Sequence, residues 1–304
     1  MKSFDEAIRL GLDYLARHGR ALEQALADFY FSDGGLEAVI HALAEYQNED
    51  GGFGKALEPD FRCPDSSILA TSEALIHVRQ AGISFSHPMA AKALQYLINT
   101  YQSEAKGWHF TPPEGDAYPH APWWFFNADA HATRHNPRPQ LLGDLFQSPE
   151  LVPSEMLESL TVSIQQDFLA EVDALQQHDL FSYLRLYHSH NVPDALKACL
   201  HQHLPAIIRR NVAEKAVDWA GYVVRPYQAV KDMHDPFLPL VANLLPAAIQ
   251  YLMDEQQPEG NWLPNWSWGE LYPEDWETAS VEWQSHLTLA NLLVLKNFKG
   301  VLSS

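Results

Sequence analysis

Gln47-Asn48-Glu49-Asp50-Gly51-Gly52-Phe53 is the stretch that decides the fold of this 304-residue chain, because it recurs. Gln256-Gln257-Pro258-Glu259-Gly260-Asn261-Trp262 repeats the glutamine, the acid and the first glycine in register, and a looser copy runs from Gln102 to Trp108. The copies begin at residues 47, 102 and 256, so the gaps between them are 55 and 154 residues, about one and three units. A period of about fifty residues indicates a repeat architecture. Each copy follows an amphipathic run, so the predicted unit is helix, tight glycine turn, helix.

Apolar residues recur along the chain mostly with the 3–4 spacing of helices, as at Leu36, Val39, Ile40 and Leu43. We therefore predict an all-α protein of about ten to twelve helices. The best strand candidate is the short stretch 221–224. Helices are expected at 4–17, 36–46, 68–79, 87–101, 153–169, 172–188, 194–209, 236–253 and 279–298.

Four long loops separate these helices, at 54–65, 108–124, 217–228 and 261–276, and they are rich in proline, aromatic and acidic residues. Loops beyond about twelve residues are usually functional or disordered, and this composition is not that of a disordered segment. No Gly/Ser linker divides the chain. A single domain, residues 1–304, is expected.

Composition excludes several classes of protein. The formal charge of −19 argues against nucleic acid or an anionic membrane as partner, because both reward a basic face. Two cysteines without C-x-x-C spacing indicate a reducing compartment, and the N-terminus does not have the pattern of a signal peptide. No apolar run reaches the eighteen or so residues that a membrane-spanning helix needs. We expect a cytoplasmic protein without an integral membrane segment, and the sequence carries no signal of its oligomeric state.

Carboxylates recur at a fixed count after the repeated motif. Twenty residues after Phe53 the chain has Glu73, and twenty residues after Trp262 it has Glu282. The same count from the third copy ends one residue before Asp129. We predict that equivalent helices carry a carboxylate near their starts, facing one mouth if the helices form a ring. The alternative is structural, since acids near a helix N-terminus are favoured by about 0.3–1 kcal/mol.

The motif resembles that of the α/α-toroid superfamily of terpenoid cyclases and protein prenyltransferases, with squalene-cyclase-like repeats. Residues 47–54 (QNEDGGFG) match it closely, residues 256–262 fairly and residues 102–108 weakly. The resemblance implies inner and outer rings of helices around a central cavity, with the glutamine ending an outer helix and the glycine turn leading to an inner one. It also implies a structural role for the motif residues Gln47, Gly51, Phe53, Gln256, Gly260 and Trp262.

The catalytic motifs of that superfamily are missing. There is no D-x-D-D, and the nearest stretch, Asn127-Ala128-Asp129-Ala130, keeps one acid. D-D-x-x-D is absent too, and neither Cys63 nor Cys199 lies in the context of a prenyltransferase zinc ligand. We therefore expect a member without the known activities, and no cofactor.

Two aromatic and acidic segments are the candidate site. Residues 260–283 alternate five tryptophans with acids, and residues 108–135 are their counterpart. If both converge on one mouth, they line an acidic, aromatic-walled central cavity for a small-molecule ligand. The candidate catalytic acids are Glu58, Asp60, Asp129 and Glu282. The candidate substrate-binding residues are Trp123, Trp124, Trp266, Trp268, Trp276, Trp283 and Glu73.

Glu58-Pro59-Asp60 follows the first glycine turn and is expected near an inner-helix entrance, although a polar loop with a proline corner explains it equally well. His131 and His135 have an i, i+4 spacing compatible with zinc on one helix face. No Glu lies between them to complete H-E-x-x-H, and chance pairs are expected among fifteen histidines. No metal site is predicted.

Three functions fit this sequence. The first is an enzyme, or a degenerate relative of one, acting on an apolar or isoprenoid small molecule, because tryptophan faces stabilise carbocations. The second is a carbohydrate-active protein, in which the tryptophans stack on sugars and two carboxylates lie about 5 Å or about 6.5–9.5 Å apart. The third is a scaffold whose motifs only maintain the repeat fold.

Overall fold

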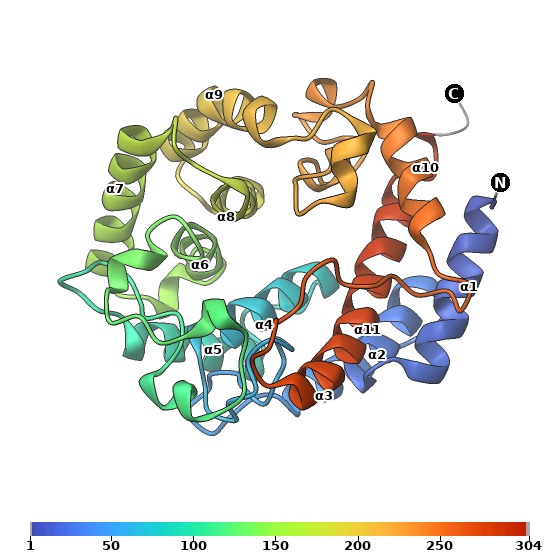
Figure 1. The fold of residues 1–304 in the computed structure, drawn as a ribbon. Coiled ribbons are helices and arrows are strands. Elements are labelled where there is room, and N and C mark those ends of the chain that lie inside the picture. Colours follow the sequence, from blue (N-terminus) through green and yellow to red (C-terminus); the bar gives the residue numbers. More distant parts are fainter. Residues whose placement is uncertain (1, 302–304) are drawn as a thin grey trace. The chain divides into compact units, whose positions relative to one another are not determined.

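The computed structural model describes residues 2–301 (Figure 1), and these residues confirm the all-α prediction. They form eleven α-helices and seven short 3-10 helices, with isolated β-bridges but no β-strand. The best strand candidate, 221–224, does not form a strand, since Val224 makes only a single bridge to Val212. None of the helices in residues 2–301 combines the length and the apolar character needed to cross a bilayer.

The chain divides into two compact units. Unit 1 combines the chain up to Ala42 with the chain from Ile208 onward, and unit 2 comprises Leu43–Ile207. Two helices run across these boundaries, α3 (Leu36–Ala44) and α9 (Asp194–Asn211). The other helices are α1 (Phe4–His18), α2 (Ala21–Phe31), α10 (Leu245–Glu255) and α11 (Pro273–Asn297) in unit 1, and α4 (Ile68–Ala81), α5 (Pro88–Thr100), α6 (Arg138–Leu145), α7 (Ser154–Glu171) and α8 (Gln177–His188) in unit 2.

Unit 1 is built around the packing of α1, α2 and α11 on one another. The side chain of Ser3 caps α1 by accepting a hydrogen bond from the Glu6 N–H. Gly11 allows α11 to approach closely, because a Cβ atom at this position would lie 2.8 Å from Leu292 Cδ2. Small residues at such crossings set how near two helix axes can come.

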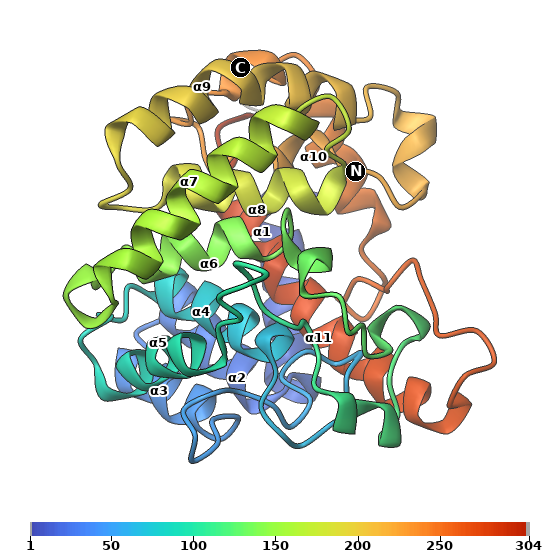
Figure 2. The ribbon, with the colours of Figure 1, turned by 90° about the vertical axis from the view of Figure 1, so that its left-hand side faces the viewer.

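Unit 2 has its closest helix pair in α6 and α8, which lie side by side in Figure 2. Gly143 of α6 explains the approach, since a Cβ atom there would lie 2.4 Å from the Ser189 hydroxyl. Every residue of α6 is buried. In the neighbouring α4, Ser67 caps the N-terminus and Gly82, with φ 71°, ends the helix in the left-handed region. The helix predicted at 68–79 is confirmed and ends two residues later than expected.

Several helix boundaries differ from the predicted ones. The expected helix at 172–188 begins only at Gln177, where the Asp179 carboxylate accepts the N–H of Gln176. The α10 helix begins at Leu245 rather than at 236, and α11 begins at Pro273, six residues before the expected 279. Helices α2 and α6 were not predicted.

The repeated motif begins at the end of a helix in all three copies, after α3, α5 and α10. Its glutamine holds the turn in the same way in two of them. The Gln47 amide donates hydrogen bonds to the carbonyls of Gly51 and Met89, both at 2.9 Å. The Gln256 amide donates to the carbonyl of Gly260 at 2.8 Å and to that of Ala7 at 2.9 Å. The glutamine therefore ties its own turn to another helix, α5 in the first copy and α1 in the second, which is a structural role.

The glycine of the motif packs closely against the helix whose carbonyl accepts the glutamine, α5 in the first copy and α1 in the second. Gly51 has φ 91°, and a Cβ atom there would lie 2.4 Å from the Lys92 carbonyl oxygen. Gly260 has φ 102°, and its Cβ atom would lie 2.1 Å from the Leu10 carbonyl oxygen. In both copies this carbonyl lies three residues after the one that accepts the glutamine. The two turns are therefore docked identically, and only glycine fits.

The aromatic residue fixes the register between turn and helix. The Phe53 N–H donates to the Thr71 hydroxyl at 3.0 Å, 18 residues along, and the Trp262 N–H donates to the Thr288 hydroxyl at 3.3 Å, 26 residues along. Thr71 and Thr288 are therefore equivalent, and the second connection is eight residues longer. The equivalent helices α4 and α11 do each carry a carboxylate, but Glu73 lies two residues after Thr71 and Glu282 lies six residues before Thr288, so the two side chains are not at equivalent positions.

The third copy is looser, as its sequence indicates. Its Trp108 indole donates to the Leu97 carbonyl at 2.8 Å, as the Trp262 indole does to Leu252 at 2.8 Å. The Gln102 amide, however, reaches only the nearby Thr100 carbonyl. The third copy therefore keeps the hydrogen bond from the indole to the preceding helix, but its glutamine does not bind a second helix.

Candidate functional site

Glu58 lies in the loop that follows the first glycine turn, and its carboxyl group is buried in unit 2. The Trp124 indole N–H donates to Glu58 Oε1 at 3.3 Å. The other oxygen, Oε2, is buried and has no hydrogen-bond partner among residues 2–301. Burial raises the pKa of Glu58 well above its usual value, and the negative charges of Asp60 and Glu73 raise it further. Burial and these charges therefore favour the protonated form of Glu58, whereas hydrogen bonds from the Trp124 indole and from the Asp60 backbone favour the ionised form.

Backbone hydrogen bonds bring this loop to the segment that carries Trp124. The Ala121 N–H donates to the Asp60 carbonyl at 2.8 Å, and the Arg62 N–H donates to the Pro119 carbonyl at 3.0 Å. Asp60 is itself buried, with 2% of its surface exposed. Of the predicted catalytic acids, Glu58 and Asp60 are thus brought together, beside a predicted substrate-binding tryptophan.

Aromatic and aliphatic side chains surround the indole that contacts Glu58. Phe110 stacks on Trp124 with ring centroids 5.0 Å apart and planes 9° apart. Both pack on a small core formed by Phe61, Cys63 and Leu69. We call these five residues the aromatic cluster. The acid therefore adjoins an apolar environment.

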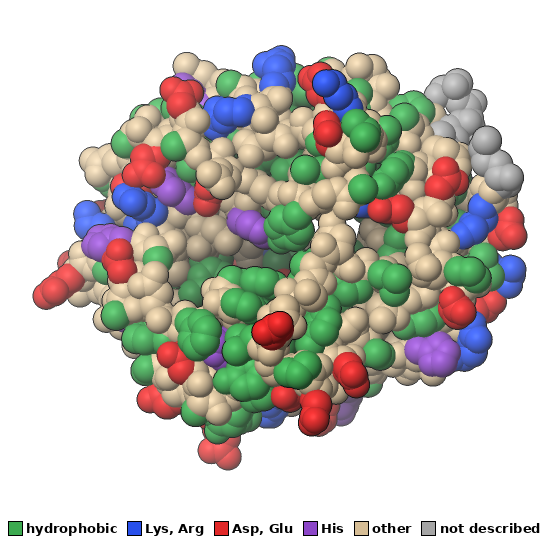
Figure 3. All heavy atoms as spheres, viewed as in Figure 1, with side chains coloured by type: hydrophobic (Ala, Val, Ile, Leu, Met, Phe, Trp, Pro, Cys, Tyr) green, Lys and Arg blue, Asp and Glu red, His purple; other side chains and the backbone are tan. Residues whose placement is uncertain are grey.

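Two neighbouring aromatic side chains point outward rather than into the aromatic cluster. Trp123 is 47% exposed and Phe125 is 52% exposed. Figure 3 shows hydrophobic side chains gathered on this face of unit 2, around the segment that follows α5. The structure therefore places the predicted ligand-binding residue Trp123 on the surface, unlike Trp124.

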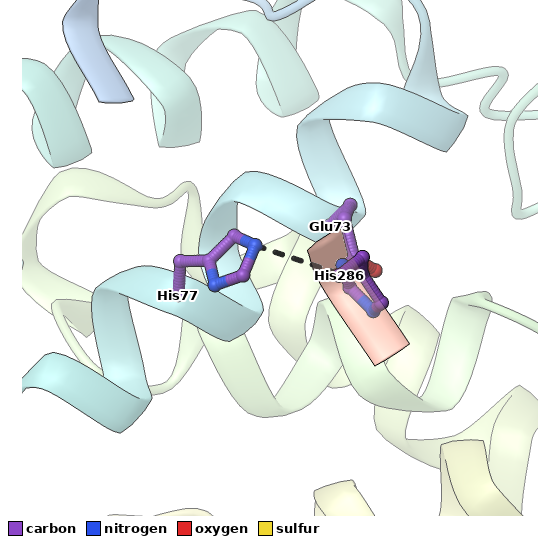
Figure 4. Close-up of side chains that lie close together, drawn as sticks. All are labelled: Glu73, His77 and His286. Carbon is purple, nitrogen blue, oxygen red and sulfur yellow. Dashed lines mark ion pairs between the residues drawn. The ribbon is translucent and has the colours of Figure 1, made fainter. Parts of the chain in front are cut away.

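Glu73 and His77 occupy one face of α4, at positions i and i+4 (Figure 4). Their side chains form an ion pair when the imidazole is protonated, with His77 Nε2 lying 3.6 Å from Glu73 Oε1. The carboxylate is 24% exposed and the imidazole 6% exposed. Because the charge of Glu73 also acts on Glu58, this predicted substrate-binding residue belongs to the same electrostatic group.

Asp129 lies apart from this group. It is exposed, and its carboxylate caps the short 3-10 helix η3 (Ala130–Thr133) by accepting the His131 N–H at 2.9 Å. The shared helix face predicted for His131 and His135 is wrong, because η3 ends before His135. His131 is exposed, whereas the buried His135 ring lies 2.9 Å from the Tyr183 hydroxyl.

The remaining predicted residues belong to unit 1. Trp266 and Trp283 meet edge to face with ring centroids 5.0 Å apart, and Trp268 packs near Trp276 with centroids 5.7 Å apart. Trp268 is almost fully buried, so it is a core residue of unit 1. Glu282 lies half-buried on α11. The central cavity that would join these side chains to Glu58 stays a prediction.

A buried charged network in unit 2 was not predicted from the sequence. Asp144 of α6 is fully buried, and Arg79 Nε of α4 lies 3.0 Å from its Oδ1. Neither Asp144 oxygen has a hydrogen bond of good geometry within residues 2–301. Burial raises the pKa of Asp144 to about 6, although the positive charges of Arg79 and Arg185 act in the opposite direction.

This raised pKa predicts a pH dependence of stability. Because the folded state holds the Asp144 proton more tightly than the unfolded state, stability is greatest below the unfolded pKa and falls as the pH rises towards about 6. The free energy of unfolding, measured with urea at pH 4 and pH 7, should therefore decrease less in Asp144→Asn than in the wild type. The difference between the two decreases should be about 2–3 kcal/mol. The exposed Asp129→Asn variant is the control and should keep the wild-type dependence. Equal dependence in Asp144→Asn and wild type would contradict the assignment.

Comparison with known proteins gives no family. A scan against protein-family models found no match for this chain. Searches of curated proteins and of solved structures found no match either. The assignment of a function therefore depends on the chemistry of the residues themselves.

Proposed function

We propose that this protein is an acid catalyst that transfers a proton from Glu58 to an apolar, unsaturated small molecule of the isoprenoid type. The observation that carries the proposal is the buried Glu58 carboxyl group. Its Oε1 accepts the Trp124 N–H, while its buried Oε2 has no partner among the described residues. Since Oε1 is the acceptor, Oε2 is the atom that carries the transferable proton.

The proposed reaction begins with a balanced proton transfer. The Oε2–H bond of Glu58 breaks, a C–H bond forms at one carbon of an alkene, and the other carbon becomes a tertiary cation. The π faces of Phe110 and Trp124 and the negative charge of Asp60 would stabilise that cation. The cation is then quenched by loss of a proton from a neighbouring carbon to the Glu58 carboxylate. The acid is regenerated, so no cofactor is consumed.

The surroundings of Glu58 favour an apolar substrate over a sugar. The indole that orients the carboxyl group is stacked on Phe110 and packs on Phe61 and Leu69. Such a site offers few hydrogen bonds to the hydroxyl groups of a sugar ring. Oε2 is buried, so access to it requires a movement of the surrounding chain, and the neighbouring Trp124 belongs to the short 3-10 helix η2 (Pro122–Trp124) within a long loop. Loops with this role commonly open and close over a substrate.

A second candidate function is hydrolysis of a glycosidic bond. The observation that favours it is the grouping of acids, because Asp60 and Glu73 both lie within electrostatic reach of Glu58. A protonated acid with a nearby ionised carboxylate is the usual arrangement of glycosidases. Glu58 would then protonate the leaving oxygen, and Asp60 or Glu73 would act as nucleophile or base.

Replacing Glu58 by glutamine tests the proposal. The purified protein is incubated in D₂O with squalene, geranylgeraniol and geranylgeranyl diphosphate, and the products are analysed by mass spectrometry. Each product molecule should gain deuterium from the acid, and Glu58→Gln should lower the rate by about 10²–10⁴-fold because the proton donor is lost. The exposed Asp129→Asn variant should react at the wild-type rate.

Three further results distinguish the alternatives. Glu58-dependent hydrolysis of aryl glycosides, without turnover of isoprenoids, would favour the second candidate. Infrared spectroscopy should show a protonated carboxyl band at neutral pH that disappears in Glu58→Gln. If this band is missing in the wild type, Glu58 is not the acid and both proposals fail.

A further inference from the structure

The loop that carries the candidate acid begins with a sharp turn. The Leu57 N–H donates to the Gly54 carbonyl at 3.1 Å and closes this turn, and we call residues 54–57 the left-handed turn. Its two central residues both lie in the left-handed region, Lys55 with φ 55° and Ala56 with φ 59°. Two successive positive φ values are typical of type I′ turns, which favour Asn-Gly rather than a lysine followed by an alanine. The local sequence therefore opposes the conformation that it adopts.

The repeated motif does not require such a turn. Within residues 2–301, the first residue after Trp262 with a positive φ is Gly269, whereas Lys55 follows its motif aromatic by two residues. The first copy leads to the buried Glu58, and the connection after the second copy carries the exposed Glu270. Backbone strain that persists in a fold is commonly found at functional sites. The strain therefore accompanies the buried acid rather than the repeat.

The side chain of Lys55 supplies contacts that hold the left-handed turn. Its ammonium group donates to the Glu45 carbonyl at 2.9 Å and to the Gln47 carbonyl at 3.0 Å. Both carbonyls follow the end of α3, where the helix dipole favours a positive charge. The Lys55 backbone N–H donates to the Cys63 carbonyl at 3.1 Å. Three hydrogen bonds at one residue thus offset the strain of its backbone.

Capping of the motif glutamine does not by itself explain why this lysine lies in a strained turn. In the second copy, the carbonyl of Gln256 accepts a hydrogen bond from the Lys2 ammonium group at 3.4 Å. Lys2 precedes α1 and therefore binds that carbonyl from a distant part of the sequence. In the first copy the lysine belongs to the left-handed turn, so its hydrogen bonds tie the turn itself to the end of α3.

We propose that Lys55 is a positioning residue, whose ammonium group holds the left-handed turn and thereby keeps the Glu58 carboxyl group in the protein interior. The inference deepens the proposed function and rests on it for the role of Glu58. The connection between the two residues is short, because Glu58 directly follows the fully buried Leu57, and its carbonyl accepts the Phe61 N–H at 3.1 Å. Opening of the turn at Lys55 moves these adjoining residues and brings water to the carboxyl group.

Infrared titration of the Glu58 carboxyl band tests this role. In each variant the band is identified by its loss when Glu58→Gln is added, and its pH midpoint is measured. Lys55→Met removes the ammonium hydrogen bonds but keeps most of the side chain. The midpoint should then fall by about one pH unit or more, because water stabilises the carboxylate. Lys55→Arg keeps a cationic donor and should retain the wild-type midpoint. Lys92→Met removes another exposed ammonium group of unit 2 and should leave the midpoint unchanged.

Relief of the strain separates positioning from a general loss of stability. Ala56→Gly removes the left-handed strain at the second central residue, so Tm should rise by about 2–4 °C while the midpoint stays at the wild-type value. Adding Ala56→Gly to Lys55→Met should restore most of the lost midpoint, because a relaxed turn needs less to hold it.

Two outcomes overturn the positioning role of Lys55. One is a wild-type midpoint in Lys55→Met, and the other is a lowered midpoint that Ala56→Gly does not restore. A wild type without the carboxyl band would contradict the proposed function itself, so the two failures are distinguishable.

Discussion

Replacing Gly260 by alanine should destabilise the protein by about 3 kcal/mol or more, because two penalties coincide at this position. The residue has φ 102°, which side chains rarely adopt, and the new Cβ atom would lie 2.1 Å from the Leu10 carbonyl oxygen. That oxygen belongs to the backbone of α1, so no rotamer change can relieve the clash. Retreat of α1 would loosen its packing on α11. The free energy of unfolding, measured by urea denaturation, is the readout.

Gly269→Ala provides a matched control in the same unit. Gly269 also has a positive φ of 64°, but a Cβ atom added there would meet nothing within 4 Å beyond its chain neighbours. The substitution should therefore cost only the left-handed strain, about 1–2 kcal/mol. A loss as small in Gly260→Ala as in Gly269→Ala would show that the turn is not docked as described. Gly51→Ala tests the equivalent turn of unit 2, where the Cβ atom would meet the Lys92 carbonyl at 2.4 Å.

Sequence reasoning predicted the helices best where amphipathic spacing and terminal signals coincided. The α4 helix is an example, with its predicted start at Ile68 and Gly82 at its end. The α6 helix was missed because all its residues are buried, so that no polar face alternates with an apolar one. The early start of α11 is indicated by Pro273 followed by acids at 274 and 275, but the tryptophans around these residues favour an aromatic loop instead.

The candidate site could be predicted only in part, since it depends on contacts between distant residues. Glu58 and Asp60 were identified from their place after the glycine turn, whereas the contact between Glu58 and Trp124 joins residues 66 positions apart. The sequence around either residue does not predict that their side chains are in contact.

The ion pair between Arg20 and Glu23 in unit 1 should prove far more costly to break than an exposed pair. Glu23 is fully buried, and its carboxylate accepts the Arg20 Nε–H at 2.8 Å and the Ser285 hydroxyl at 3.3 Å. The Ser285 hydroxyl in turn accepts the Arg20 backbone N–H at 3.0 Å. The carboxylate thus joins the start of α2 to α11. Glu23→Ala should cost about 3–5 kcal/mol, because it breaks a buried ion pair by removing one of its two charges.

Asp13→Asn is the control, because it removes an ion pair that is exposed rather than buried. Arg9 and Asp13 form an ion pair of similar length, 2.9 Å, but their side chains are 62% and 53% exposed. Water replaces that interaction when it is lost, so the free energy of unfolding should change by at most about 0.5 kcal/mol. If Glu23→Ala is as mild as Asp13→Asn, then water reaches Arg20 and the α2–α11 junction is looser than the contacts imply. A large loss confined to Glu23→Ala would show that burial, rather than the number of charges, decides the contribution of an ion pair in this strongly acidic protein.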